Sequence, residues 1–505
     1  MIERDSLKRR AKSLSTLASV STAEKTEAWN RFKKIRNEIN NRKKREEILY
    51  KSEKLKESFD STDILWRTAK SFMGWKTAGI PVQLSVDGQL LTSAKQIAQV
   101  MNNYFIEKVY HIRRQMKTAP ADNSKIETIM QNKTCRLQFH HISVSKVQKL
   151  LRGLSSSKST GMDGLDNFSV KLSAAHIAKP LQYIIELSRW QQKFPSAWKK
   201  SKIIPLHKKN DPLDKQNYRP VSLLSPLSKV LEKTVYEELY CYFSNNRIFH
   251  PSLHGYRKGR STQTALLQLY DKFVRAAGNG KLSGAVLLDL SSAFDLVDPE
   301  ILIQKLKLYN VDDTVLNWFQ SYLMERQQAV WIDHAYSDLQ YCNVGVPQGS
   351  NLGPLLFLAF YNDLPFNLTC DVEAYADDTT LYSSGVTFTE LETKLTNNCA
   401  RVSLWMAQNK LKLNASKTHV MAIGTSRRLQ QQEGEIKVTM DGLDLIESET
   451  KAEVLLGCSV QSNLKWNSQV EAVQQKLKTR IGALEHLRYV LPYTFCKLIV
   501  NAYLQ

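Results

Sequence analysis

The hydrophobic and polar positions at the start of the chain follow a helical period. In the stretch RFKKIRNEINNRKKREEILYKSEKLKESF, residues 31–59, apolar side chains recur every three or four positions among dense lysine and arginine. This pattern predicts long, basic, amphipathic helices over about the first seventy residues. Two interpretations stay open: a solvated face supported by i,i+4 ion pairs such as Glu38 with Arg42, or a surface that binds RNA.

The pattern then changes twice before residue 135. The segment TAGIPVQLSVDGQLLTS predicts a short hairpin that turns at Asp87 and Gly88, because Asp-Gly between alternating apolar residues is a strong turn signal. AKQIAQVMNNYFIEKVY, residues 94–110, predicts a helix, and the polar residues 117–133 predict a connector. From ISVSKVQKLLRGL to about Trp466, β-prone runs alternate with helical stretches without repeats, which favours one large α+β unit. The last forty residues have a helical period and no capping signal, so we expect the chain to be cut short there.

The net charge of the chain indicates which class of partner it binds. Its 505 residues carry 70 Lys and Arg against 49 Asp and Glu, a net charge of +21. Such an excess favours a polyanion, above all nucleic acid, over a merely well-solvated surface. The seven cysteines are scattered and form no C-x-x-C pair, which argues against a disulfide framework or a zinc site. No apolar run is long enough to span a membrane, so we expect a soluble intracellular protein.

Two adjacent carboxylates stand in the β-prone run DVEAYADDTTLYSS. Apolar residues alternate with Glu373 and Tyr375 before Asp377 and Asp378, and Thr379 to Tyr382 form a second β-prone run, which predicts strand, turn, strand with both acids in the turn. Aspartate is a common turn residue, and that simpler explanation requires no further carboxylate nearby. A further one is found in GAVLLDLSSAFDLVDPEILIQKL, where an apolar strand ends in Asp289, and Asp298 with Pro299 predicts the start of a helix.

Three carboxylates in one site would repel one another unless cations neutralised them. The economical hypothesis is a pair of Mg²⁺ ions, for which Mn²⁺ could substitute, because paired ions of this kind serve in-line phosphoryl transfer. Together with the basic charge, this indicates a nucleic-acid polymerase.

These acids lie in a series of blocks that resembles reverse transcriptases, closest to those of non-LTR (LINE-type) retrotransposons. The blocks agree in order and spacing, and the basic N-terminal helices with LWRTAKSFMG resemble the linker that precedes the polymerase in such elements. Eight blocks in order are a far stronger signal than one short motif. They are KSTGMDGL, IIPLHKKND, NYRPVSLLSPLSKVLEK, HGYRKGRSTQTAL, DLSSAFD, GVPQGSNLGPLLF, YADD and LKLNASKT.

The resemblance implies a metal site and a sugar-sensing residue. Asp289, Asp377 and Asp378 would bind the two metal ions as the catalytic carboxylates, with the backbone carbonyl of Leu290 as an additional ligand. Phe294 matches the family's steric gate, an aromatic ring beneath the incoming sugar that excludes a 2′-hydroxyl; an ordinary core phenylalanine is the alternative.

Further substrate contacts follow from the same resemblance. The run SKIIPLHKKNDPLDKQNYRPVSLL predicts a two-stranded fingers hairpin, in which Lys208, or Lys209 in its place, and Arg219 would contact phosphates. Gln348 would lie near the nucleotide or the template backbone. Lys417 matches a lysine proposed to donate a proton to pyrophosphate, although a surface lysine would look the same.

Two glycine-containing blocks complete the comparison. In GVPQGS, Gly345 and Gly349 would allow close approach of the backbone, against the alternative of a plain loop-to-helix junction. EVLLGCSVQSNLKW matches the primer-grip hairpin around Gly457, although Val454 stands where an aromatic residue is usual.

The fold implied by the resemblance is α+β, a right-hand polymerase with a basic helical N-terminal extension and a partial helical thumb. We expect a basic linker at 1–75, a hairpin, helix and polar linker at 76–135, fingers and palm at 136–465, and the start of a truncated thumb at 466–505. The implied partners are an RNA template, a DNA primer or nicked target DNA, and dNTPs, with nuclear access inferred from the resemblance alone.

The alternatives are an inactive relic or domesticated nucleic-acid-binding protein, an RNA-templated RNA polymerase, and a group II intron maturase. Phe294 disfavours the RNA polymerase, and the LINE-like linker disfavours the maturase. No endonuclease precedes Met1 and no Cys/His knuckle follows the palm, so we expect a fragment of a retrotransposon protein that does not nick DNA by itself.

Overall fold

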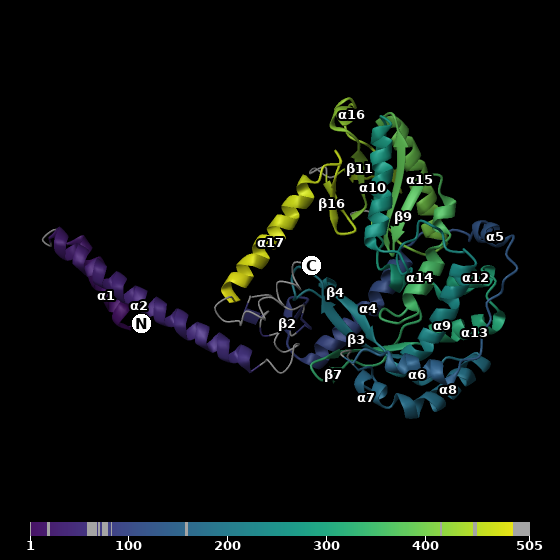
Figure 1. Cartoon of the computed structure of the whole chain (residues 1–505), viewed down its shortest axis with the longest axis horizontal. Coiled ribbons are helices and arrows are strands. Elements are labelled where there is room, and N and C mark those ends of the chain that lie inside the picture. The colour runs from purple at the N-terminus through teal and green to yellow at the C-terminus, as the bar shows by residue number, and fades with distance from the viewer. Residues whose placement is uncertain are drawn as a thin grey trace. The chain divides into compact units, whose positions relative to one another are not determined.

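The structure, a computed structural model, divides into two compact units (Figure 1). One unit is formed by residues 78–469, and the other by residues 1–77 together with 470–505. The residues described are 2–17, 21–57, 68, 71–72, 79–81, 83–156, 160–414, 417–447 and 452–487. The segment LWRTAKSFMG lies mostly outside the described residues, as do the first two residues of KSTGMDGL and the whole chain after Leu487.

The N-terminal part of the smaller unit is helical. Helix α1 spans Ile2–Thr16 and α2 spans Thr22–Lys56. Ser21 and Glu24 form a reciprocal capping box, which satisfies backbone donors at the start of α2. Arg42 pairs with Glu46, at 3.0 Å, instead of with the expected Glu38. Both partners are exposed, so this pair adds little to the stability of the helix.

A five-stranded sheet forms the centre of the larger unit, with strand order β14-β11-β5-β10-β9. Successive side chains of a strand point to opposite faces of the sheet, and here both faces are apolar. Helices therefore cover both faces. On β5, Ala285 belongs to the cluster around helix α10, whereas Val286 belongs to the main core with helix α15. The bounds are β5 Leu282–Leu288, β9 Asp371–Tyr375, β10 Asp378–Gly385, β11 His419–Ile423, β14 Ile446–Glu447, α10 Thr262–Gly278 and α15 Phe388–Gln408.

A second sheet contains the predicted fingers hairpin. Strands β3 (Lys200–His207) and β4 (Tyr218–Leu223) pair antiparallel, and β6 (Gln327–Ile332) pairs parallel with β3. The short strands β7 (Ala335–Tyr336) and β8 (Gln340–Tyr341) both pair with β6.

The residues before 115 pack against this second sheet. Strands β1 (Leu84–Val86) and β2 (Gln89–Leu91) form the predicted hairpin, and both turn residues, Asp87 and Gly88, are left-handed. The following helix α4 spans Ala94–Arg114 and lies against β6 and β7. Leu84, Ile97 and Met101 share one buried cluster with residues of β3 and β6. The hairpin and helix are therefore part of the same hydrophobic structure as the sheet.

The stretch 117–133 differs from the expected polar connector, because it contains the short helix α5 (Ser124–Met130). Ile126 and Met130, spaced by four residues, are buried in the main core. Three apolar residues in one seven-residue stretch are too short a periodic signal to predict a helix among polar neighbours, and packing decides the outcome.

The all-apolar α14 (Gly353–Tyr361) lies in that core, which also contains residues of α5 and α15 (Figure 1). No described helix is long and apolar enough to cross a membrane. The remaining elements are α6 Val144–Arg152, α7 Asn167–Leu172, α8 Ala174–Trp190, α9 Pro226–Asn245, α11 Ala293–Leu296, α12 Pro299–Leu308, α13 Asp313–Leu323, α16 Ser426–Gln430, β12 Thr439–Met440, β13 Leu443–Asp444, β15 Ala452–Leu455, β16 Cys458–Gln461 and α17 Asn467–Leu487.

Candidate active site

The hairpin of β9 and β10 presents two of the three predicted carboxylates. Tyr375 pairs with Asp378, so the turn consists of Ala376 and Asp377, and Ala376 is left-handed. Asp378 is therefore the first residue of β10, whereas the sequence pattern predicts that it lies in the turn. Gly255 lies against this turn, since a Cβ atom there would be 2.4 Å from the backbone nitrogen of Ala376. Only glycine allows this approach, which holds the turn in place.

The third carboxylate, Asp289, follows directly after β5, as predicted. Because Leu288 pairs with Thr379 on β10, Asp289 lies at the same end of the sheet as Asp378. The block LKLNASKT runs beside it: the backbone nitrogen of Asn414 donates to the carbonyl of Asp289 at 2.8 Å. Lys417 Nζ lies 3.8 Å from Asp289 Oδ2. The three acids therefore meet at one edge of the sheet, with Lys417 beside them.

All three acids line one cleft of about 920 Å³. Burial raises the pKa of Asp378, and the charges of Asp377 and Asp289 raise it further. These carboxylates therefore repel one another, which is the condition that a bound cation would relieve. Within the described residues, no group of three His, Cys, Asp or Glu side chains is already gathered in a metal-holding geometry. The donor set of carboxylate oxygens and the nearby Leu290 carbonyl nevertheless fits a hard divalent cation such as Mg²⁺.

Phe294 lies on the short helix α11 and faces the same cleft. Its ring stacks on Phe357 of α14, with ring centroids 4.6 Å apart, and meets Tyr256 edge-on at 6.1 Å. One side of the ring is thus fixed by the core while part of it remains at the cleft wall. Packing on Phe357 gives the ring a defined position, as a residue that senses sugar shape requires.

The basic residues expected from the sequence also line the cleft, except for Lys209. Lys208 directly follows the last residue of β3. Arg219 on β4 pairs with Leu206 on β3. Burial lowers the pKa of Lys208, and the charges of Arg219 and Lys417 lower it further. Cations and carboxylates that line the same cleft produce a field suited to phosphates that carry divalent ions.

Lys108 of α4 is a cleft residue that sequence reasoning missed. Burial lowers the pKa of its ammonium group, and the carboxyl of Asp295 opposes that shift. The available signal was its place on a predicted helix, three residues after the buried Phe105. Nothing in the sequence showed that this face would reach the cleft, because the contact joins segments almost two hundred residues apart.

Gly345 and Gly349, on either side of Gln348, allow the close approach of the backbone that the sequence predicts. A Cβ atom at Gly345 would lie 2.8 Å from the Cα of Asp295, and one at Gly349 would lie 2.5 Å from the carbonyl oxygen of Ser222. Both glycines are also left-handed. Gln348 lines the cleft and donates from Nε2 to Asp295 Oδ1 at 2.5 Å.

The predicted hairpin around Gly457 is also present. Strands β15 and β16 pair through a turn of Leu456 and Gly457, both left-handed. Leu455 and Val460 pack with Leu269 of α10, and Val454 is 69% exposed. The position usually occupied by an aromatic residue is thus on the surface of the hairpin.

Comparison with known proteins agrees with this geometry. The family described as reverse transcriptase (RNA-dependent DNA polymerase) matches residues 206–471. The chain is 26% identical over 442 residues, 85% of its length and 47% of the relative, to the "Probable RNA-directed DNA polymerase from transposon BS" of Drosophila melanogaster. It is 25% identical over 435 residues, 84% of its length and 46% of the relative, to the "RNA-directed DNA polymerase from mobile element jockey" of the same fly.

A more distant relative is the "Retrovirus-related Pol polyprotein from type-1 retrotransposable element R2" of Popillia japonica, 22% identical over 304 residues, 57% of this chain and 40% of the relative. The chain spans about half the length of the first two relatives. The chain therefore belongs to the reverse transcriptase (RNA-dependent DNA polymerase) family, among those of LINE-type transposons.

Proposed function

We propose that this chain extends a 3′-hydroxyl primer with dNTPs on an RNA template. The observation that carries the proposal is the one cleft that Asp289, Asp377 and Asp378 line together with Lys208 and Arg219. Acidic and basic side chains in one cleft fit a substrate made of phosphates and divalent cations. Like charges gathered in a partly buried site destabilise the fold unless a ligand neutralises them.

The three carboxylates and the Leu290 carbonyl would hold two Mg²⁺ ions, or Mn²⁺ in their place. Bound ions of this kind would activate the primer hydroxyl and stabilise the leaving oxygen. Lys208 and Arg219 would hold the triphosphate, and Lys417 would donate a proton to the departing pyrophosphate. Phe294 would exclude a 2′-hydroxyl and so select dNTPs over NTPs.

The arrangement of domains follows from these roles. The sheet of β5, β9 and β10 would be the palm, the hairpin of β3 and β4 part of the fingers, and α17 the start of a thumb within 466–505. The hairpin of β15 and β16 would grip the primer. We extend the proposal to the basic helices of residues 1–75 as an RNA-binding linker, to nicked target DNA as primer, and to action in the nucleus.

Primer extension tests the proposal directly. The purified chain is expected to incorporate dNTPs on an RNA template with a DNA primer when Mg²⁺ is supplied, and Asp377→Asn is expected to abolish incorporation. Asp313→Asn is the matched control, because its side chain is 71% exposed and lies outside the cleft. If neither the parent nor the control extends the primer while both bind it, the chain is an inactive nucleic-acid-binding relic instead. Ribonucleotide incorporation in place of dNTPs would indicate an RNA polymerase.

A further inference from the structure

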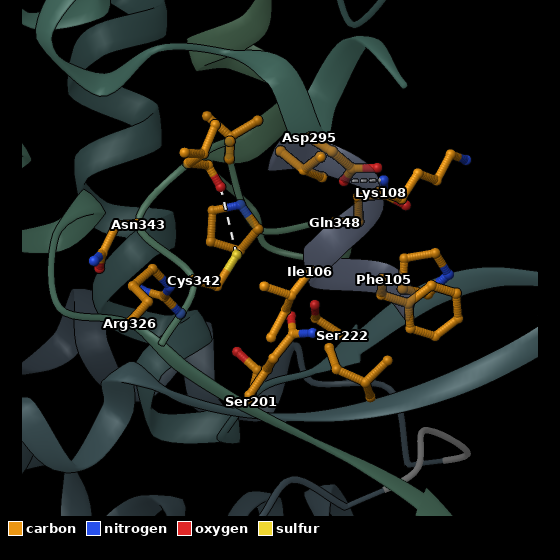
Figure 2. A pocket seen from close by; sticks show the side chains of 18 of the residues that line it. Phe105, Ile106, Lys108, Ser201, Ser222, Asp295, Arg326, Cys342, Asn343 and Gln348 are labelled. Carbon is orange, nitrogen blue, oxygen red and sulfur yellow. Dashed lines mark hydrogen bonds between the residues drawn. The ribbon is translucent and has the colours of Figure 1, made fainter. Parts of the chain in front are cut away.

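A half-buried carboxylate lies next in the chain to the proposed sugar-selecting residue. Asp295 follows Phe294 on α11, and its Oδ1 accepts a hydrogen bond from Gln348 Nε2 at 2.5 Å (Figure 2). The main chain of Gln348 is fixed as well, because its carbonyl accepts from the backbone nitrogen of Ser222 at 3.0 Å. Gln348 is thus held at both ends, by α11 and by the fingers hairpin.

The bond determines which end of the Gln348 amide is available. An ionised carboxylate can only accept hydrogen bonds, so the amide must present its NH₂ group to Asp295. Its oxygen Oε1 is then left for a donor elsewhere, and Gln348 borders the cleft that contains the three catalytic carboxylates. We propose that Asp295 is a positioning residue, which orients Gln348 so that Oε1 accepts a hydrogen bond from the incoming nucleotide.

The backbone around the pair has the rigidity that this role requires. The nitrogen of Gly345 donates to the carbonyl of Val297 at 2.9 Å, and the nitrogen of Val346 donates to the carbonyl of Phe294 at 2.9 Å. The missing Cβ of Gly345 allows this segment to lie directly on the backbone of Asp295. These backbone hydrogen bonds fix the segment before Gln348 against the segment of Phe294, and the side-chain bond from Gln348 to Asp295 adds orientation of the amide.

The surroundings keep Asp295 ionised at neutral pH. Burial raises its pKa to about 6, although the bond from Gln348 and the charge of Lys108 lower it. Arg326 and Tyr218 line the same cavity, as does the thiol of Cys342, whose pKa is raised by burial and by Asp295. A cavity of about 80 Å³, shown in Figure 2, lies beside the pair between α4, β3 and the 342–348 loop. Above about pH 6, Asp295 is thus an acceptor only.

A double-mutant cycle tests the inference, which rests on the proposed function. Asp295→Asn keeps the shape of the side chain. The asparagine amide can donate as well as accept, so it can bond the Gln348 amide in either of that amide's two orientations. We expect Asp295→Asn to raise the KM for dNTP by about tenfold, the effect of one charge-assisted hydrogen bond, with a smaller change in kcat. In a Gln348→Ala background, the same change is expected to have no further effect on KM. Asp313→Asn serves again as the control.

The outcomes separate the two claims. A parent chain that does not extend a primer removes the proposed function and this inference with it. An active parent in which Asp295→Asn and Gln348→Ala have additive effects on KM removes the inference alone, because Asp295 then acts independently of Gln348. Unchanged KM in Asp295→Asn removes it as well.

A second variant covers the case in which Asp295→Asn does not fold. Lys108→Met removes the cation that lowers the pKa of Asp295, so protonation of Asp295 moves to higher pH. Since a protonated carboxyl no longer fixes the amide, the KM for dNTP should rise as the pH falls, and should rise at a higher pH in Lys108→Met than in the parent. Identical pH profiles of KM would overturn the inference.

Discussion

The acids of the cleft and the acids of the core have opposite surroundings. In the core, Asp363 accepts from Lys305 Nζ at 2.6 Å and from Trp405 Nε1 at 3.1 Å, and its side chain is 2% exposed. In the cleft, Asp289 is 38% exposed and its nearest cation is Lys417 at 3.8 Å. Asp377 and Asp378 form no ion pair within the described part of the chain.

Within the part of the chain that the structure describes, the acid of the core is thus closely paired, whereas the acids of the cleft are not. A buried carboxylate must be fully paired, because an unpaired buried charge costs several kcal/mol. Under the proposed function, the cleft carboxylates remain without a close ion pair so that substrate and metal ions can neutralise them; burial and the charges of Asp377 and Asp289, which raise the pKa of Asp378, are the cost of this arrangement. Removing a carboxylate of the cleft and removing the cation that pairs with a carboxylate of the core should therefore give opposite results.

The largest effect is expected for Asp377→Asn. Loss of one metal-binding carboxylate should reduce primer extension by at least about 10³-fold, because bound ions contribute several kcal/mol to the transition state. The same change removes a repelled charge, so the unfolding midpoint in urea should not fall. The measurements are single-turnover extension and urea unfolding. Retained extension, or a clear loss of stability, would contradict the division between cleft and core.

Lys305→Met should produce the reverse. It leaves Asp363 buried without its cation, and breaking such a pair costs about 3–5 kcal/mol of unfolding free energy. Extension per folded molecule should be unchanged, since Lys305 does not line the cleft. Lys307→Met is the matched control, because it is exposed on the same helix α12. A loss below about 1 kcal/mol, the range of surface pairs, would show that this ion pair is not what stabilises the core.

Phe294→Ala should give an intermediate effect, since this ring belongs to both regions. Removing the ring should increase ribonucleotide incorporation relative to dNTP by roughly 10–100-fold, corresponding to about 1–3 kcal/mol of discrimination. Competition between matched rNTP and dNTP on one template measures the ratio. A variant that loses stability but still rejects ribonucleotides would make Phe294 a core residue only.

The smallest effect concerns His250, a polar group of the core. Burial and the charge of Arg257 lower the pKa of His250 to about 4, so the folded chain holds it neutral while Nδ1 accepts from the nitrogen of Ser252 at 3.2 Å. Between pH 6.5 and 4 the unfolded chain binds the extra proton, so stability is lost as the pH falls through this window.

His250→Asn keeps an acceptor and removes this titration. Its thermal midpoint should therefore fall less than that of the parent between pH 7 and 4.5, by roughly 2–5 °C. Scanning calorimetry at matched ionic strength measures the difference. Parallel pH curves for parent and variant would show that His250 does not contribute to the acid sensitivity of the core.

Much of the site was predictable because it depends on neighbouring residues. An apolar run ending in Asp289, alternation around Asp377, and Asp298 before Pro299 specify strands, a turn and a helix start through local interactions alone. The hairpins at Gly88 and Gly457 follow from turn chemistry in the same way. The resemblance to reverse transcriptases then supplied the roles, and the three acids, Leu290, Phe294, Gln348, Lys208, Arg219 and Lys417 line the cleft, whereas Lys209 does not.

Only the tertiary structure decided the contacts between distant segments. The approach of Gly255 to Ala376, the entry of Lys108 into the cleft, and the bond between Asp295 and Gln348 each join residues more than fifty positions apart. Helix α5 formed in an expected connector for the same reason, because two buried side chains outweighed a weak local preference. Local patterning sets the elements of this chain, whereas burial and charge pairing between distant elements are determined only when the core assembles.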